Sequence, residues 1–484
     1  MVPPERCRAL NAHPEAKDGR FVLYWMVAHR RPFHNFALQQ AVARAVTLGK
    51  PLLIVEWLGL GHPWAGDRFH RFMLEGMVDN NTHFAGTTAT YRPWIETAAT
   101  RRSEALDRLF AQAAAIVTDD WPCFIHPGLI ADAGARAPVA MTAVDSNGLL
   151  PLAAGEAKER AVDFRRLLQK TLRPHLDRFP LADPLAGVRL PLLTDVPIPV
   201  QDPAAFLAPG GLAALPIDHR IGAGVDRGGW KAAAACLADF RRHRLARYHE
   251  DRSDFEAEAA SGLAPWLHYG HISVHEITAT LLKAEDWSPA RLGPVTASKE
   301  GWWGVSAPVE AFLDELITWR ELGHHFCRQR PGYDQWETLP AWARQTLEDH
   351  AGDPRPRLYT REQLDAGDTH DPLWNAAQRQ LVTEGRMHNY LRMLWGKKVL
   401  EWSPHPRDAF ATLIDLNNRY AQDGCDPNSY SGIAWCFGRF DRPWGPIRDI
   451  FGTIRYMSSD NTARKFKVGG YLARYGATRQ TTFI

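Results

Sequence analysis

The sequence lacks the features of a membrane, secreted or strongly charged protein. None of its apolar runs approaches the ~20 residues that cross a bilayer, and its six cysteines form no C-x-x-C pair. The net charge of +2 indicates no chain-wide surface for polyanions. Residues 1–20 are polar and contain no apolar core of a signal peptide. We therefore expect a cytoplasmic protein with free thiols and no membrane segment.

Common catalytic and phosphate-binding motifs are absent as well. The chain contains no G-x-x-x-x-G-K-[ST], no G-x-S-x-G and no H-E-x-x-H. Gly222, Gly224 and Gly228 have the wrong spacing for the G-x-G-x-x-G fingerprint of dinucleotide-binding folds. These absences disfavour a P-loop nucleotidase and the common hydrolase mechanisms.

Three histidines form the best sequence candidate for a metal site. His268, His271 and His275 recur at a spacing that places imidazoles on one face of a helix. Pro265 and Gly270 interrupt that helix, however, and no cysteine completes a compact ligand set. Hydrogen-bonded structural histidines are the better interpretation, and we predict no metal.

The chain divides into three parts by pattern. Residues 1–178 alternate apolar strands, such as 21–26 and 51–58, with amphipathic helices, such as 36–48 between Asn35 and Gly49. A weaker strand is expected near 83–90, a helix over 103–114, and two further buried strands after it. This rhythm predicts an α/β domain with a doubly wound, Rossmann-like parallel sheet. Residues 179–229 are rich in proline and glycine and predict an extended connector, whereas residues 230–484 predict an all-α domain.

Tryptophan is over-represented, with 18 residues. Trp395 and Trp402 are two helical turns apart, about 10 Å along the axis, and Trp374 opens the preceding helix. Taken alone, such a stripe is typical of core packing. Basic residues outnumber acidic ones between Arg439 and Arg479, which indicates either a solvated surface or a local nucleic-acid interface.

These tryptophans lie in a block that resembles the class II cyclobutane pyrimidine dimer photolyases of the photolyase/cryptochrome superfamily. The resemblance is carried by WNAAQRQLVTEGRMHNYLRMLWGKKVLEW (374–402), LNNRYAQDGCDPNSYSGIAW (416–435) and FGTIRYM (451–457). FMLEGM (72–77) and VDSNGLLPL (144–152) extend it into the first half, so that it covers nearly the whole chain.

The resemblance implies an N-terminal antenna domain and a C-terminal helical domain that binds FAD. In this family the reduced cofactor, FADH⁻, absorbs blue light and donates an electron to a pyrimidine dimer flipped out of UV-damaged DNA. The expected enzyme is a carbon–carbon lyase that acts as a monomer and joins the nucleoid when it binds DNA. The sequence does not decide whether a second chromophore, a deazaflavin or a folate, binds as an antenna. The alternatives are a blue-light photoreceptor that binds FAD without repairing DNA, and a DNA-binding protein without flavin.

The resemblance also assigns individual residues. Glu315 corresponds to the acid that hydrogen-bonds a thymine carbonyl and stabilises the radical anion, and Asn417 corresponds to an asparagine beside flavin N5. The expected dimer and DNA contacts are Glu315, Trp319, Met393, Trp435, Arg442, Trp444 and Arg455. The expected FAD contacts are Tyr248, Ser261, Gly262, Leu263, Arg320, Asn417 and Asp423. The expected electron relay runs from the flavin through Trp395 and Trp374 to Trp402, which is placed toward solvent.

The sequence departs from the family pattern at several positions. Ala264 replaces a serine, His271 a glutamine, Cys425 a charged residue and Phe440 a histidine. Phe440 lies in the 436–443 loop that meets DNA in the family, so the departure leaves open whether duplex DNA is repaired. Residues 83–97 also differ from the family pattern, so the sequence does not establish an antenna pocket.

Overall fold

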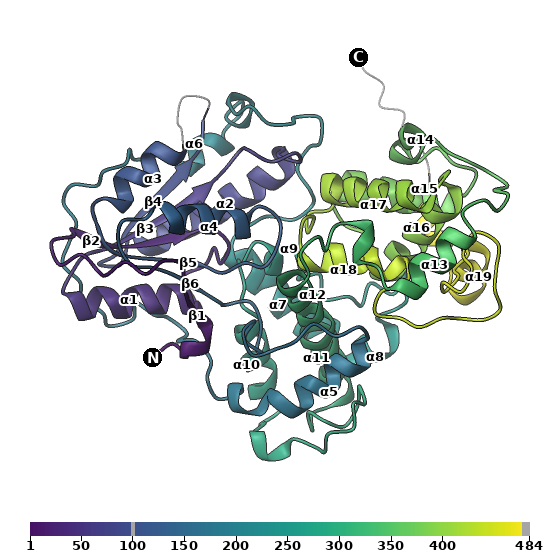
Figure 1. Cartoon of the computed structure of the whole chain (residues 1–484), viewed down its shortest axis with the longest axis horizontal. Coiled ribbons are helices and arrows are strands. Elements are labelled where there is room, and N and C mark those ends of the chain that lie inside the picture. Colours follow the sequence, from purple (N-terminus) through teal and green to yellow (C-terminus); the bar gives the residue numbers. More distant parts are fainter. Residues whose placement is uncertain (98–101, 477–484) are drawn as a thin grey trace.

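A six-stranded sheet forms the core of the N-terminal half (Figure 1). The computed structural model describes residues 1–97 and 102–476. The strand order is β1-β6-β5-β2-β3-β4; β1 pairs antiparallel with β6, and the other neighbours are parallel. The strands are β1 (Cys7–Ala9), β2 (Phe21–Met26), β3 (Leu52–Leu58), β4 (Thr90–Ile95), β5 (Ala113–Asp119) and β6 (Met141–Val144). The predicted doubly wound parallel sheet is therefore confirmed.

Both faces of this sheet are buried. In β2, Phe21, Leu23 and Trp25 belong to one apolar core, while the alternate residues, such as Val22 and Tyr24, belong to another. Every residue of β2, β3 and β5 is buried, as expected for parallel strands covered by helices on both sides.

The first helix begins and ends where its caps predict. The Asn35 side chain accepts a hydrogen bond from the Leu38 amide at 3.1 Å, and Gly49 adopts the left-handed conformation at φ 61°. The helices of this half and the connector are α1 (Phe36–Leu48), α2 (Asp67–Phe84), α3 (Arg102–Phe110), α4 (His126–Arg136), α5 (Ala161–Thr171) and α6 (Pro203–Leu207).

Two sequence predictions in this half have wrong bounds. The strand expected near 83–90 does not form there, because α2 continues to Phe84 and the strand that pairs with β3 is β4, at 90–95. The helix expected to reach residue 114 ends at Phe110. Ala113 pairs with Phe21 of the neighbouring strand, so sheet pairing overrides the helical propensity of the alanine run.

The C-terminal half is helical. No helix of the described residues is both long and apolar enough to cross a membrane. A π-helical turn, η6 (Asp314–Trp319), lies between α11 and α12. The helices are α7 (Trp230–His243), α8 (Tyr248–Asp251), α9 (Ala264–His268), α10 (Val274–Ala284), α11 (Ala307–Leu313), α12 (Arg320–Gln329), α13 (Ala341–Asp349), α14 (Arg361–Ala366), α15 (Pro372–Glu384), α16 (Asn389–Trp402), α17 (Pro406–Tyr420), α18 (Pro427–Cys436), α19 (Ser459–Lys465) and α20 (Gly469–Tyr475).

Buried polar side chains join the two halves. Glu321 on α12 accepts hydrogen bonds from the backbone amides of Leu149 and Leu150, at 2.7 and 3.0 Å. Arg68 on α2 donates to backbone carbonyl oxygens of the helical half, among them that of Leu381 at 3.1 Å. Because separating the two halves would leave these buried polar side chains without partners, the bonds fix the sheet against the helices that form the site.

Candidate functional site

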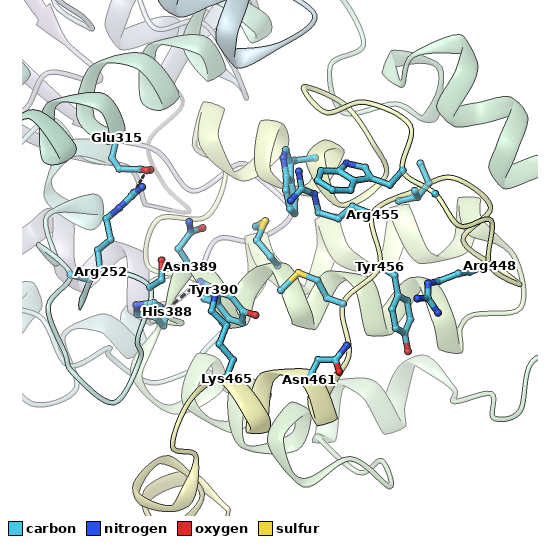
Figure 2. A pocket seen from close by; sticks show the side chains of 18 of the residues that line it. Arg252, Glu315, His388, Asn389, Tyr390, Arg448, Arg455, Tyr456, Asn461 and Lys465 are labelled. Carbon is cyan, nitrogen blue, oxygen red and sulfur yellow. Dashed lines mark hydrogen bonds and ion pairs between the residues drawn. The ribbon is translucent and has the colours of Figure 1, made fainter. Parts of the chain in front are cut away.

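A cleft of about 670 Å³ opens in the helical half, within the usual size range of cofactor and ligand sites. It is bounded by η6, α16 and α18. Shared lining residues, among them Arg252 and Glu315, connect it to an outer hollow of about 680 Å³, whose lining is drawn in Figure 2. The structure thus brings most of the predicted site residues together from distant parts of the chain. Those lining the cleft are Tyr248, Ser261, Glu315, Trp319, Arg320, Met393, Asp423, Trp435 and Arg455, and Trp444 lines the outer hollow.

One acid projects into both hollows. Figure 2 shows Glu315 facing Arg252, with which it forms a direct ion pair. Burial raises the pKa of Glu315, and the Arg252 guanidinium opposes that rise. A π-helical turn places Glu315 and Trp319 at this wall, as is frequent at functional sites. No local sequence pattern indicates Arg252, since it and Glu315 are 63 residues apart.

Polar groups gather at the inner end of the cleft. Arg320 donates to the carbonyl oxygen of Asn147 at 2.7 Å, and His268 lies 3.1 Å from Asp426. Although burial acts to raise the pKa of Asp426, its hydrogen bond to His268 and the charge of Arg320 hold that pKa far below its usual range. A Cβ at Gly432 would meet only Met393 Cε, at 4.0 Å, so this wall has room for a bound group. The donors and the space fit a large polar cofactor.

The segment before α9 turns sharply beside this cleft. Gly262 adopts φ 74°, where only glycine is unstrained, and its carbonyl oxygen accepts a hydrogen bond from Arg386 at 3.3 Å. Leu263 is buried in the apolar core. Ser261 lines the cleft, so this segment contributes one hydroxyl and a backbone turn to the site.

Asn417 and Asp423 occupy different positions. Asp423 lines the cleft and forms an ion pair with Arg392 at 3.1 Å. Asn417 is buried in α17 with its amide nitrogen 3.4 Å from Asn418 Oδ1. Among the residues that the structure describes, Asn417 does not line the cleft, so its predicted contact with a flavin rests on the resemblance.

The three relay tryptophans are connected through α15 and α16. Trp395 donates from Nε1 to Gln378 Oε1 at 2.9 Å, and Trp374 donates from Nε1 to the carbonyl oxygen of Trp395 at 3.1 Å. The ring centroids of Trp374 and Trp402 are 5.4 Å apart. The three residues thus form a connected series from Trp395 through Trp374 to Trp402, none of them lines the cleft, and the position of Trp395 beside a flavin rests on the resemblance.

The outer end of this chain differs from the expectation. Trp402 is only 3% exposed, although it was placed toward solvent. Tyr359 lies 5.3 Å from its ring and His370 lies 5.4 Å from it, and both are more exposed than Trp402. The Tyr359 hydroxyl hydrogen-bonds His370 Nδ1 at 2.7 Å. No sequence pattern indicates this pair, because Tyr359 and His370 lie in the two connections that flank α14, where the sequence has no periodicity.

The loop after α18 is organised by one carboxylate. Asp441 accepts hydrogen bonds from Trp444 Nε1 at 3.0 Å and from Arg455 Nε at 2.8 Å. The guanidinium of Arg442 lies 4.6 Å from the centroid of the Trp444 ring. Ile447 is 66% exposed nearby, so this loop presents an apolar side chain to solvent among cationic side chains.

Phe440, the departure from the family histidine, lies at the base of this loop. It is buried at φ 64° and packs edge-on against Phe326 with centroids 5.4 Å apart. Its backbone forms a β-bridge with Arg160. The substitution thus places an apolar anchor under the loop and leaves the contacts of Asp441 in place.

The three histidines of the sequence candidate do not form a cluster. His271 Nδ1 accepts a hydrogen bond from the Gly229 amide at 3.0 Å, while His275 contacts Ser273 and His268 contacts Asp426. Within residues 1–97 and 102–476, no group of three or more His, Cys, Asp or Glu side chains is arranged to hold a metal ion.

A second cavity lies where β2, β3 and β5 end. Its aromatic wall includes Trp57, Trp64, Trp121 and Phe124. The carboxyl ends of parallel strands, where the strand order reverses, are the usual ligand site of doubly wound sheets. This cavity is separate from the cleft in the helical half.

Curated proteins similar to this chain share one name. A deoxyribodipyrimidine photo-lyase of Methanothermobacter thermautotrophicus is 35% identical over 480 residues, which cover 98% of each chain. The chain belongs to the deoxyribodipyrimidine photo-lyase family. Family members from Oryza sativa and Potorous tridactylus are 34% and 32% identical, over 95% of this chain and 88% and 82% of theirs. The resemblance stated from the sequence is thereby confirmed at the level of the photo-lyase family.

Solved structures agree on the fold of this family. A class III photolyase of Agrobacterium tumefaciens matches with a TM-score of 0.69 at 16% identity, covering 94% of this chain and 86% of its own. A cryptochrome of Synechocystis matches with a TM-score of 0.65 at 15% identity, covering 94% and 88%. A scan against protein-family models returned no match.

Proposed function

We propose that this member of the photo-lyase family is a class II enzyme that uses blue light to split cyclobutane pyrimidine dimers in UV-damaged DNA. One observation carries the proposal: the cleft joins an acid–arginine pair to an aromatic wall, and Met393 and Trp435 of that wall pack against the core that contains the three connected tryptophans. Bound FAD, as FADH⁻, supplies the electron that starts ring splitting. The domains that follow from this proposal are an α/β domain over 1–178, a connector over 179–229 and the FAD- and DNA-binding domain over 230–484.

The inner end of the cleft would hold the cofactor. Tyr248, Ser261 and Arg320 line it and offer hydroxyl and guanidinium donors to a diphosphate or a sugar. Gly262 and Leu263 supply the backbone turn beside them, and the carboxylate of Asp423 faces the same space. Asn417, in α17 behind this wall, is assigned to the flavin ring by the family pattern.

The end of the cleft that meets the outer hollow would hold the flipped dimer. Trp319, Met393 and Trp435 form an apolar wall against which a neutral pair of pyrimidines can pack. Arg252 compensates the charge of Glu315, so the acid does not present an unpaired negative charge to a substrate that gains an electron. The side chain of Glu315 thereby orients the dimer without repelling the electron.

The loop of residues 441–447 would enter the duplex. Asp441 fixes the Trp444 ring, and Ile447 is exposed near it. Apolar side chains inserted between base steps stabilise a flipped base by filling the space that it leaves. Arg442 and Arg455 lie over the Trp444 ring and supply positive charge toward the phosphates.

The indole chain would carry electrons toward resting cofactor. Trp395, Trp374 and Trp402 are connected by hydrogen bonds or ring contacts, and Tyr359 extends the chain to a more exposed position. The second cavity, at the end of the sheet, has a volume of only about 80 Å³, too small for a deazaflavin or a folate, so we assign no antenna chromophore to it. We further propose a monomer that works in the cytoplasm and joins the nucleoid with DNA.

A repair assay tests the proposed function. Photoreduced protein is mixed with an oligonucleotide that contains one thymine dimer, and the dimer is counted by chromatography after blue light and after darkness. We expect loss of the dimer in light only. Protein that binds FAD but leaves the dimer intact would instead be a photoreceptor, and protein that binds no flavin would be neither.

A further inference from the structure

A second groove, of about 860 Å³, lies behind the 441–447 loop. Residues 441–443 of the loop line this groove, whereas residues 444–446 line the outer hollow of the cleft. The groove is also bounded by α13 and by residues 159–160 and 330–340. The loop is therefore a partition with one hollow on each side.

Arginines dominate this groove. Its cationic residues are Arg160, Arg330, Arg344, Arg439 and Arg442, and its acids are Glu159, Glu337 and Asp441.

All three of these acids already have cationic partners. Glu159 pairs with Arg330 and with Arg439, the latter at 3.1 Å. Glu337 pairs with Arg407 at 3.0 Å, and Asp441 pairs with Arg455. The acids of the groove therefore cannot neutralise its remaining arginines.

Two guanidinium groups are left for a ligand. Among residues 1–97 and 102–476, neither Arg344 nor Arg442 has an ion-pair partner within 4.0 Å. The Nε atom of Arg344 and that of the almost fully buried Arg439 have no hydrogen-bond partner in the same part of the chain. Buried donors without partners are costly, so an anion in the groove would remove that cost.

We propose that this groove binds phosphates of the undamaged strand, opposite the dimer, in duplex DNA. The inference rests on the proposed function. A loop that takes the place of a flipped dimer lies between the damaged strand and the strand opposite it. The damaged strand lies on the side of the cleft, because its dimer enters there, so the undamaged strand falls on the side of Arg344 and Arg442. Guanidinium forks bind phosphate oxygens in pairs.

The test compares two forms of one lesion. Fluorescence anisotropy gives the affinity of wild type, Arg344→Ala and Arg344→Lys for a dimer in single-stranded DNA and in a duplex, at several salt concentrations. We expect Arg344→Ala to weaken duplex binding about fivefold and to reduce its salt slope by about 0.9. Single-strand affinity stays within twofold of wild type, and Arg344→Lys recovers part of the duplex affinity.

A matched control removes one arginine elsewhere. Arg108→Ala on α3 lowers the net charge equally and leaves both affinities unchanged. An equal loss on both DNA forms, or no loss on either, overturns the proposal. The proposal is also overturned if Arg344→Ala loses binding of inorganic phosphate but keeps its duplex affinity, since the groove would then be a site for small anions.

The repair assay separates this proposal from the proposed function. Suppose that wild type splits the dimer in both DNA forms, but Arg344→Ala lowers the affinity for both forms equally or for neither. Only the groove assignment is then wrong. If wild type splits no dimer in either form, the proposed function fails, whatever the binding data show.

Discussion

Replacement of Asp441 tests whether the loop is held ready for DNA. The Asp441 carboxylate connects Trp444 and Arg455, and Asp441→Ala removes both contacts. A hydrogen bond to a charged group contributes ~1.5–3 kcal/mol when it is buried. The side chain of Arg455 is 38% exposed, so we assign only about 1 kcal/mol to each contact. The loop must then be ordered on binding, at a cost of about 2 kcal/mol, or roughly 30-fold in affinity.

The assay is anisotropy titration with a duplex that carries one dimer. Asp441→Asn keeps an acceptor for Trp444 but loses the ion pair, so we expect roughly a fivefold loss. Asp449→Ala, which removes an exposed acid two residues beyond the loop, is the control and leaves the affinity unchanged or slightly higher. An Asp441→Ala protein that binds the duplex within twofold of wild type would refute the reasoning.

Three further predictions follow from the site and the core. Trp395→Phe slows photoreduction of oxidised flavin but leaves repair by chemically reduced protein intact, with Trp336→Phe as control; equal loss of both activities contradicts the relay. Glu315→Ala lowers the repair yield per absorbed photon more than it lowers dimer affinity, and an effect on affinity alone argues against its role. Burial lowers the pKa of His126 to about 4 and that of His324 to about 3. Because the unfolded chain binds these protons near pH 6.5, the stability that the two neutral histidines contribute is complete above that pH and decreases below it, by on the order of 2 kcal/mol for His126 at pH 5. Urea unfolding at pH 7.5 and 5 measures this loss, and equal stability at both values contradicts it.

Local chemistry predicted much of the fold. Asn35 and Gly49 mark the ends of α1 because a cap depends on the residue itself and its near neighbours. The alanines at the start of β5 misled the prediction, since their helical propensity is weaker than pairing with β2, which lies far away in sequence. The predicted bounds of helices and strands were wrong where pairing with a distant strand decides them.

The site shows the same division. The family pattern located Glu315, Trp319 and Trp435, and the structure brings all three to one cleft. It did not identify Arg252, whose pairing with Glu315 depends on the packing of α8 against α11, the helix that leads into η6. The exposure of Trp402 was also misjudged, because a connecting loop covers its ring. Contacts between segments that are distant in sequence could therefore not be predicted from local patterns.

One measurement tests the central claim most directly. Protein with bound, reduced flavin is incubated with a dimer-containing oligonucleotide, and half of the sample is exposed to blue light while the other half stays dark. The account predicts that intact thymines replace the dimer in the illuminated half alone. An unchanged amount of dimer after illumination, with the flavin shown to be bound and reduced, would contradict it.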